Sequence, residues 1–224
     1  MEIGELLGSG RSADVYAIDG ERVLRRYRTA TDVGREAAVM VYVRERGFPV
    51  PDVYPGDESD TDLVMGRLSG PTMLEAVIEG SITPEETGDT LAGLLLRLHE
   101  IPALASADLG DRVLHLDLHP DNVMLTVRGP VVIDWANTEE GPPGLDCAMS
   151  AVILAQVAVD PESELAALAR SVLVALLAGL GAAMDFGGGL DQVKARRGVD
   201  QGVSEREKGF LDAAVALVRD LRAR

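Results

Sequence analysis

The pattern of apolar and polar residues predicts short strands in the first third of the chain. Brief apolar or alternating segments at 6–7, 14–18 and 22–27 are separated by Gly8-Ser9-Gly10 and by Asp19-Gly20. Glycine-containing turns between alternating segments are typical of antiparallel strands joined by hairpins. This part of the chain therefore reads as a small antiparallel sheet.

Helical patterns surround and follow these strands. Residues 31–46 carry apolar positions at helical spacing, with Thr31 as the expected N-cap and Gly47 as the stop. After a buried strand at 63–65, most segments from Thr72 onward are helical. Capping boxes are expected at Thr83/Glu86 and Ser204/Glu207, N-caps at Asp146 and Asp160, and a loop with solvated charges, Lys194, Arg196 and Arg197 among them, between 185 and 202.

A second hairpin is expected near the middle of the chain. Two apolar runs, 123–127 and 131–133, are bridged by Arg128-Gly129-Pro130. The loop before the first run contains Asp117 and Asn122, and Asp134 follows the second run directly. Because a hairpin returns its two ends to one edge, these three side chains are expected to converge. Mg²⁺ prefers such oxygen ligands and takes only one or two of them from the protein.

The string His115-Leu-Asp-Leu-His-Pro-Asp-Asn122, followed by a hairpin and Asp134, resembles the catalytic loop and metal-binding Asp of the protein-kinase superfamily. In detail it is similar to the aminoglycoside phosphotransferase and choline kinase branch, where the loop reads H-[GL]-D-[LF]-H-P-x-N. The resemblance extends from Leu7 to about Ala158. It implies an α+β, two-lobed protein-kinase-like fold: residues 1–66 as a nucleotide-binding lobe with a small antiparallel sheet and one helix, and residues 67–224 as a mainly helical lobe.

The resemblance also implies roles for the central residues. Asp117 would receive or orient the proton of the substrate hydroxyl, while Asn122 and Asp134 would hold Mg²⁺ on ATP. Phosphoryl transfer depends on positioning and charge neutralisation more than on covalent chemistry, so few residues suffice. In the same way, an Asp in a D-x-A setting braces the catalytic loop in this family, and Asp146 matches that position.

A glycine-rich turn near the N-terminus is the expected phosphate-binding element. Gly8 and Gly10 allow backbone N–H groups to approach phosphates, and Ser9 and Ser12 add hydroxyl donors. The same string fits a dinucleotide-binding fingerprint, but that motif requires a helix after the glycines, whereas residues 14–18 alternate like a strand. A strand, loop and strand over a nucleotide resembles the glycine-rich loop of kinases.

The resemblance places the remaining nucleotide-binding residues, with one departure. The family has a Lys on the third strand that contacts the α- and β-phosphates, and this chain has Arg25 there. Arginine can bind phosphate with two parallel hydrogen bonds and keeps its charge. Glu36 would pair with Arg25, and the backbone near Met65 and Arg67 would hydrogen-bond the adenine.

Two other patterns compete with this interpretation. His115, Asp117, His119 and Asp121 alternate as in a transition-metal site, but Pro120 interrupts the regular strand that such a site would need. Asp185-Phe186-Gly187 spells the metal motif of protein kinases, yet it lies far beyond Asn122 and no strand pair precedes it.

Charge and cysteine content narrow the function classes. The 224 residues include 37 acidic and 21 basic side chains, a formal charge of −16 that disfavours nucleic acid and anionic membranes as partners. Cys147 is the only cysteine, so no intrachain disulfide can form. The N-terminus lacks a signal-peptide pattern, and the apolar run 172–184 is short for a membrane span, which favours a cytoplasmic protein.

We therefore expect a phosphotransferase that uses ATP and Mg²⁺ and transfers the γ-phosphate to a hydroxyl of a small molecule such as an aminoglycoside, choline or a sugar. Acidic residues such as Glu139, Glu140 and Asp185 are candidates to face a cationic acceptor. The pattern specifies neither the acceptor nor the oligomeric state. Arg25 in the Lys position motivates an alternative, a non-catalytic nucleotide-binding module of the same fold. A metal-dependent hydrolase is the third possibility.

Overall fold

The computed structural model describes residues 3–55, 59–181 and 185–223. The chain divides into two compact units. The first consists of Met1–Pro71 and Met124–Thr138, and the second of Thr72–Val123 and Glu139–Arg224. The predicted lobes were 1–66 and 67–224, so the division by compactness differs in placing 124–138 with the N-terminal residues.

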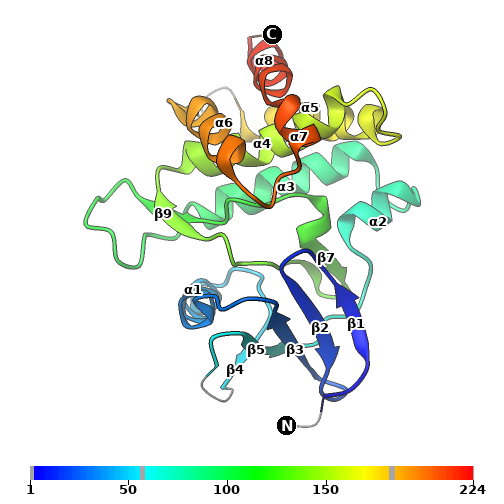
Figure 1. Cartoon of the computed structure of the whole chain (residues 1–224). Helices are drawn as coiled ribbons and strands as arrows, with labels where there is room; N and C mark the ends of the chain where they lie inside the picture. The colour runs from blue at the N-terminus through cyan, green and yellow to red at the C-terminus, as the bar shows by residue number, and fades with distance from the viewer. Residues whose placement is uncertain (1–2, 56–58, 182–184, 224) are drawn as a thin grey trace. The chain divides into compact units, whose positions relative to one another are not determined.

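The first unit is built on a five-stranded antiparallel sheet in the order β1-β2-β3-β5-β4 (Figure 1). Two of its turns follow the predicted chemistry. The Gly10 N–H donates to the Ala13 carbonyl at 2.9 Å, and the Asp19 carboxylate accepts from the N–H groups of Glu21 and Arg22. The strands are β1 (Leu6–Ser9), β2 (Ala13–Ala17), β3 (Arg22–Tyr27), β4 (Val53–Tyr54) and β5 (Asp62–Gly66).

Helix α1 (Val33–Glu45) is the helix of this unit that carries the predicted Glu36. It begins two residues after the predicted N-cap: Asp32, not Thr31, accepts a hydrogen bond from the Arg35 N–H at 2.9 Å. A short carboxylate at this position satisfies an N–H that the helix itself leaves unpaired. The helix ends before Gly47, which has a φ of 80°, a left-handed conformation that glycine adopts without strain.

The predicted central hairpin is present. Strands β7 (Val123–Thr126) and β8 (Gly129–Val132) pair with each other. The Val132 N–H donates to the Pro49 carbonyl at 2.9 Å, and Trp135 lies fully buried with its ring edge-on to Phe48. These contacts explain why the residues after β7 pack with the N-terminal sheet.

The second unit is mainly helical (Figure 1). Its core lies among α3, α4 and α5, where Leu91, Leu95, Leu173 and Leu176 are completely buried. A short antiparallel pair is formed by β6 (Arg112–Leu114) and β9 (Glu139–Gly141), and residues 115–119, part of the predicted catalytic loop, connect β6 to the 3-10 turn η1 (Pro120–Asn122). The helices are α2 (Met73–Ile78), α3 (Pro84–Leu98), α4 (Pro143–Val159), α5 (Ala166–Leu180), α6 (Gly189–Val199), α7 (Glu205–Gly209) and α8 (Leu211–Arg222).

Helices α3 and α5 approach each other through two glycines. A Cβ atom added at Gly88 would lie 2.4 Å from the Ala175 Cβ, and one added at Gly179 would lie 2.7 Å from the Ala92 Cβ. These distances are shorter than any normal contact, so the two backbones are held closer than side chains would allow. Helix α3, which carries His99 at its C-terminal end, is therefore fixed by close packing.

Three expectations about this unit are corrected. Residues 189–199 form helix α6 rather than a loop, and Arg196 on it pairs with Glu139 at 2.8 Å. Helix α4 begins at Pro143, so Asp146 lies in its first turn and does not cap it. Helix α5 begins at Ala166, because Asp160 is engaged with the Glu162 N–H and with Arg206.

The predicted capping boxes at Thr83/Glu86 and Ser204/Glu207 are confirmed. Within the part of the chain that the structure describes, none of the helices combines the length and apolar character needed to cross a membrane.

Candidate active site

Strand β3 places two large side chains on one face. Alternation along a strand puts Arg25 and Tyr27 on the same side, and both are buried. Arg26, between them, faces the other way and pairs with the Asp62 carboxylate at 2.8 and 2.6 Å. The predicted pairing of Glu36 with Arg25 therefore agrees with the geometry.

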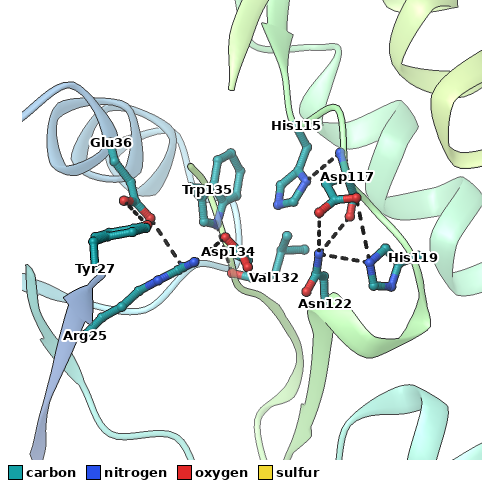
Figure 2. A network of polar contacts seen from close by, with 10 residues as sticks. All are labelled: Arg25, Tyr27, Glu36, His115, Asp117, His119, Asn122, Val132, Asp134 and Trp135. Carbon is teal, nitrogen blue, oxygen red and sulfur yellow. Dashed lines mark hydrogen bonds and ion pairs between the residues drawn. The ribbon is translucent and has the colours of Figure 1, made fainter. Parts of the chain in front are cut away.

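Arg25 is shared between two carboxylates (Figure 2). Its Nη1 lies 3.5 Å from the Glu36 Oε1, and its Nη2 donates to the Asp134 Oδ1 at 2.5 Å. Burial opposes the positive charge, but Asp134, Tyr27 and Glu36 outweigh it and raise the pKa of Arg25 above its usual value. The side chain is therefore a permanent cation held beside the predicted metal ligand.

Glu36 is the buried anchor of this cluster. Its Oε2 accepts a hydrogen bond from the Tyr27 hydroxyl at 2.6 Å, and its Oε1 lies 3.5 Å from the Arg25 Nη1. Burial raises the pKa of Glu36, and the opposing effects of Arg25 and Tyr27 do not cancel it. These contacts tie α1 to β3, and through Arg25 to the Asp134 carboxylate.

Asp134 sits at a strained corner. Its φ is 63°, a left-handed conformation that costs a non-glycine residue about 1–2 kcal/mol. The corner is fixed on its far side by Trp135, whose indole N–H donates to the Val132 carbonyl at 3.0 Å. Such strain persists where surrounding contacts over-determine the backbone, and it is common at functional sites.

In the second unit, buried Asp146 holds the predicted catalytic loop. Its carboxylate accepts from the backbone N–H groups of His115 at 2.9 Å and of Leu116 at 2.7 Å, and lies 3.0 Å from His99 Nε2. Leu116 has a φ of 60°, so here too a left-handed residue is held by a buried carboxylate. Burial would raise the pKa of Asp146, but the bonds from His99 and the backbone lower it instead.

Asp117 and Asn122 are brought together by this loop (Figure 2). The Asn122 amide nitrogen donates to the Asp117 carbonyl at 2.9 Å, and it lies 3.4 Å from the Asp117 Oδ2 and 3.2 Å from His119 Nε2. With its nitrogen engaged, the amide oxygen is the Asn122 atom that can ligate a hard cation. Asp134 belongs to the first unit, and its convergence with Asp117 and Asn122 stays a prediction.

The glycine-rich turn is held by a residue that the sequence did not single out. Arg28 donates to the Gly10 carbonyl at 3.1 Å, to the Ser9 hydroxyl at 3.0 Å and to the Asp14 carboxylate at 2.6 Å. The Ser9 hydroxyl in turn donates to Asp14. Gly8 has open space around its Cα, as a phosphate-binding glycine requires. Ser12 lies in the same exposed turn.

The predicted adenine-binding segment lies at the end of β5. Met65 is on this strand, paired with Val23 on one side and Val53 on the other. The Arg67 N–H donates to the Glu21 carbonyl at 2.7 Å, so this donor is already used within the sheet. The role of the segment at an adenine stays a prediction.

The competing metal patterns find little support in the geometry. In the described ranges 3–55, 59–181 and 185–223, no group of three or more His, Cys, Asp or Glu side chains is arranged to hold a metal ion. The His115 ring is fully buried, and its Nδ1 accepts from the Asp117 N–H at 3.3 Å. The Asp185 carboxylate accepts from the Gly187 N–H, which makes that motif a simple turn.

Two of the acidic residues proposed to face a cationic acceptor have partners of their own. Glu139 pairs with Arg196 at 2.8 Å. Glu140 accepts from the consecutive backbone N–H groups of Leu104, Ala105 and Ser106 at 2.6 to 3.1 Å. Both carboxylates are thus engaged in local structure, which removes much of their support for a cationic substrate.

Comparisons with solved structures show the fold. A complex of the aminoglycoside phosphotransferase APH(2")-IIa with gentamicin superposes with a TM-score of 0.60 at 13% identity, covering 96% of this chain and 91% of that one. Amicoumacin kinase hAmiN, in complex with AMP-PNP, Ca²⁺ and Ami, gives 0.60 at 12% identity, with 97% and 88% covered. A choline/ethanolamine kinase family protein from Mesorhizobium loti gives 0.53 at 18% identity, with 100% and 89% covered. The predicted α+β, kinase-like fold is confirmed.

Comparisons of the sequence itself give a family but no close relative. A search of curated proteins finds no significant match. The model of one family matches residues 3–112 and 102–186, which together cover most of the chain. The chain therefore belongs to the phosphotransferase enzyme family.

Proposed function

We propose that this protein transfers the γ-phosphate of ATP to a hydroxyl of a small molecule, with Mg²⁺ bound to the nucleotide. The observation that carries the proposal is the loop in which Asn122 bonds the Asp117 backbone while buried Asp146 holds the preceding residues. This arrangement gives Asp117 a fixed direction with a partly exposed carboxylate, 28% accessible. A fixed, accessible carboxylate is what a phosphoryl-transfer enzyme needs beside its acceptor hydroxyl.

Each residue has one task in this proposal. Asp117 accepts or orients the proton of the acceptor hydroxyl. The Asn122 oxygen and the Asp134 carboxylate are oxygen ligands of the kind that Mg²⁺ takes, and the metal would neutralise charge on the transferred phosphate. Arg25, held by Glu36, contacts the α- and β-phosphates, and the backbone of the turn with Gly8, Ser9, Gly10 and Ser12 covers them. The backbone near Met65 and Arg67 contacts the base.

The acceptor is a small hydroxylated molecule. The structural neighbours include proteins described as phosphotransferases or kinases of aminoglycosides, amicoumacin, and choline or ethanolamine, so these classes define the first panel. The test is to incubate the protein with Mg-ATP and this panel and to detect phosphorylated product by mass spectrometry. Binding of ATP by calorimetry is measured in parallel. Absence of both product and binding would refute the proposal.

A matched pair of loop variants tests the role of Asp117. Asp117→Asn removes the carboxylate and is expected to lower turnover by about a thousandfold while leaving the nucleotide dissociation constant within about threefold of wild type. Asp121→Asn changes an exposed carboxylate of the same loop and is expected to keep full turnover. Equal losses in the two variants would mean that the effect comes from disturbing the loop.

One observation favours a second function, a nucleotide-binding module without turnover. The guanidinium of Arg25 stands where the family has Lys and lies 2.5 Å from the Asp134 carboxylate that would bind the metal. This alternative predicts that ATP raises the melting temperature while no acceptor is phosphorylated. A nucleotide melt combined with the turnover assay therefore separates the two functions.

A further inference from the structure

Tyr27 contacts both partners of the predicted nucleotide-binding ion pair. Its hydroxyl donates to the Glu36 Oε2 at 2.6 Å, and the Arg25 guanidinium carbon lies 4.8 Å from the centre of its ring. The side chain is 4% exposed, so it is fixed by packing as well as by these contacts. A planar guanidinium over an aromatic face is a favourable cation–π arrangement that a buried setting strengthens.

The contacts of Tyr27 close a circuit of three side chains in the first unit (Figure 2). Starting from the Tyr27 ring, the circuit runs to the Arg25 guanidinium, whose Nη1 lies 3.5 Å from the Glu36 Oε1, and returns from the Glu36 Oε2 to the Tyr27 hydroxyl. The Asp134 carboxylate is attached to this circuit through the other terminal nitrogen of Arg25. A closed circuit restricts each member more than a single pair would, because displacing one breaks two contacts.

The two contacts made with Glu36 differ in length. Tyr27 has the short bond to Glu36, and Arg25 has only a long one of 3.5 Å to the same carboxylate. The other terminal nitrogen of Arg25, Nη2, donates to the Asp134 carboxylate. Arginine can serve two carboxylates because its two terminal nitrogens diverge, whereas a lysine would present one nitrogen at a single point. With Tyr27 bonded closely to Glu36, the side chain required beside it is one that can contact Glu36 and Asp134 at the same time, as Arg25 does.

We propose that Tyr27 is a positioning residue that holds Arg25 through its ring and Glu36 through its hydroxyl, and so sets the geometry of Arg25 and Asp134 toward the nucleotide phosphates. The inference rests on the proposed function, since it assigns Tyr27 a task at the nucleotide. Removing the hydroxyl frees one Glu36 oxygen, so Arg25 shifts toward Glu36 and the corner at Asp134 loses its fixed partner. Nucleotide binding weakens as a result.

The test compares two tyrosine-to-phenylalanine variants in the same sheet. Tyr27→Phe keeps the ring and removes the hydroxyl, while Tyr16→Phe makes the same change on the neighbouring strand β2. Calorimetry with Mg-ATP is expected to show about tenfold weaker binding for Tyr27→Phe and no change for Tyr16→Phe. In steady-state assays the KM for ATP rises and the KM for the acceptor stays unchanged.

A double-mutant cycle separates positioning from simple loss of packing. If Tyr27 acts through Glu36, Tyr27→Phe adds less than about twofold to the loss already caused by Glu36→Ala, because alanine leaves no acceptor for the Tyr27 hydroxyl. Arg25→Lys, which supplies the family's own residue, is expected to bind Mg-ATP about tenfold more weakly than wild type in the presence of Tyr27. Full additivity of Tyr27→Phe and Glu36→Ala would overturn the inference.

The outcomes keep this inference distinct from the function on which it rests. A wild-type protein that binds no ATP refutes the proposed function, and the inference falls with it. A wild-type protein that binds ATP as tightly as its Tyr27→Phe variant leaves the function standing and refutes the role of Tyr27 alone. Melting curves of all variants confirm that binding is measured on folded protein. If Tyr27→Phe does not fold, tight Mg-ATP binding by Arg25→Lys refutes the fit between Tyr27 and Arg25.

Discussion

Two buried carboxylates, Glu36 in the first unit and Asp146 in the second, do similar work under opposite electrostatic conditions. Asp146 accepts the backbone N–H of the left-handed residue Leu116, and Glu36 contacts Arg25, the side chain that pairs with the left-handed residue Asp134. Burial raises the pKa of Glu36, whereas the bonds to Asp146 overcome burial and lower its pKa. Burial alone therefore does not decide the direction in which the pKa of a buried carboxyl group shifts.

The difference comes from the donors. Asp146 accepts from two backbone N–H groups and from His99, all within 3.0 Å, and all three donate to the ionised form. Glu36 has one short bond from Tyr27 and a long contact with Arg25, and the Asp134 carboxylate nearby works against its charge. The donors around Asp146 thus favour its ionised form, while burial and the Asp134 carboxylate disfavour the ionised form of Glu36.

The largest test of this contrast is Asp146→Asn. An amide offers one accepting oxygen and turns an NH₂ toward donors, so at least one backbone N–H is left unpaired. The free energy of unfolding is expected to fall by about 3–5 kcal/mol, with loss of turnover, as when one partner of a buried ionic network is removed. Urea denaturation measures the change. A loss below about 1 kcal/mol would show that an uncharged amide satisfies the three donors around residue 146 almost as well as the carboxylate does.

The pH dependence of stability should separate the two groups by sign. The lowered pKa of Asp146 means that its contribution is present above its ordinary value of 3.8 and is lost as the pH falls through the lower folded value. The raised pKa of Glu36 means the reverse: its contribution is full below 4.5 and declines as the pH rises through the higher folded value. We expect the free energy of unfolding of wild type to contain both contributions between pH 2.5 and 7. The Asp146→Asn variant is expected to lack the loss of stability toward acid pH, and the Glu36→Gln variant to lack the loss of stability above pH 4.5.

Glu36→Gln should have a smaller effect on stability than Asp146→Asn. The amide keeps an oxygen for the Tyr27 hydroxyl, and Arg25 keeps Asp134 as its counter-charge. The free energy of unfolding is expected to change by about 1 kcal/mol at pH 7 while Mg-ATP binding weakens. A stability loss as large as that of Asp146→Asn would erase the contrast between the two carboxylates.

The smallest overall effect is expected for Cys147→Ala, which should lower stability slightly and leave function unchanged. The Cys147 thiol is fully buried 3.9 Å from His99 Nδ1, and burial raises its pKa, so it is an uncharged neighbour of the Asp146 network. Replacing it removes a small apolar group and a weak donor, with an expected loss of about 1 kcal/mol. Thermal melts measure this loss, and unchanged turnover is expected. A collapse of turnover would mean that His99 needs the thiol to hold Asp146.

The sequence predicted those features whose signal is local or carried by the family resemblance. The hairpin around Gly129, the capping boxes and the pairing of Glu36 with Arg25 belong to this group. Tyr27, Arg28 and the bond from His99 to Asp146 were missed, because each depends on which distant element packs against an ordinary side chain. Alternation along β3 does place Tyr27 on the same face as Arg25. It does not indicate that the Tyr27 hydroxyl bonds to Glu36 on another element.

Helix α6 was missed for a different reason. Its sequence begins among glycines and carries few apolar positions, so its period is weak, and Leu190 and Val193 are its buried large side chains. Contacts made after folding stabilise it, among them the pairs Lys194–Asp212 and Arg219–Asp191 with α8. Local propensity alone could not have indicated this helix.

The glycine contact between α3 and α5 offers a way to make the protein heat-labile without touching a functional group. A methyl group at residue 88 would collide with Ala175, and α3 carries His99 at its C-terminal end. Widening this seam would move the histidine away from the carboxylate that it supports. The Gly88→Ala variant is thus expected to melt at a lower temperature than wild type, although all of its predicted functional side chains are unchanged.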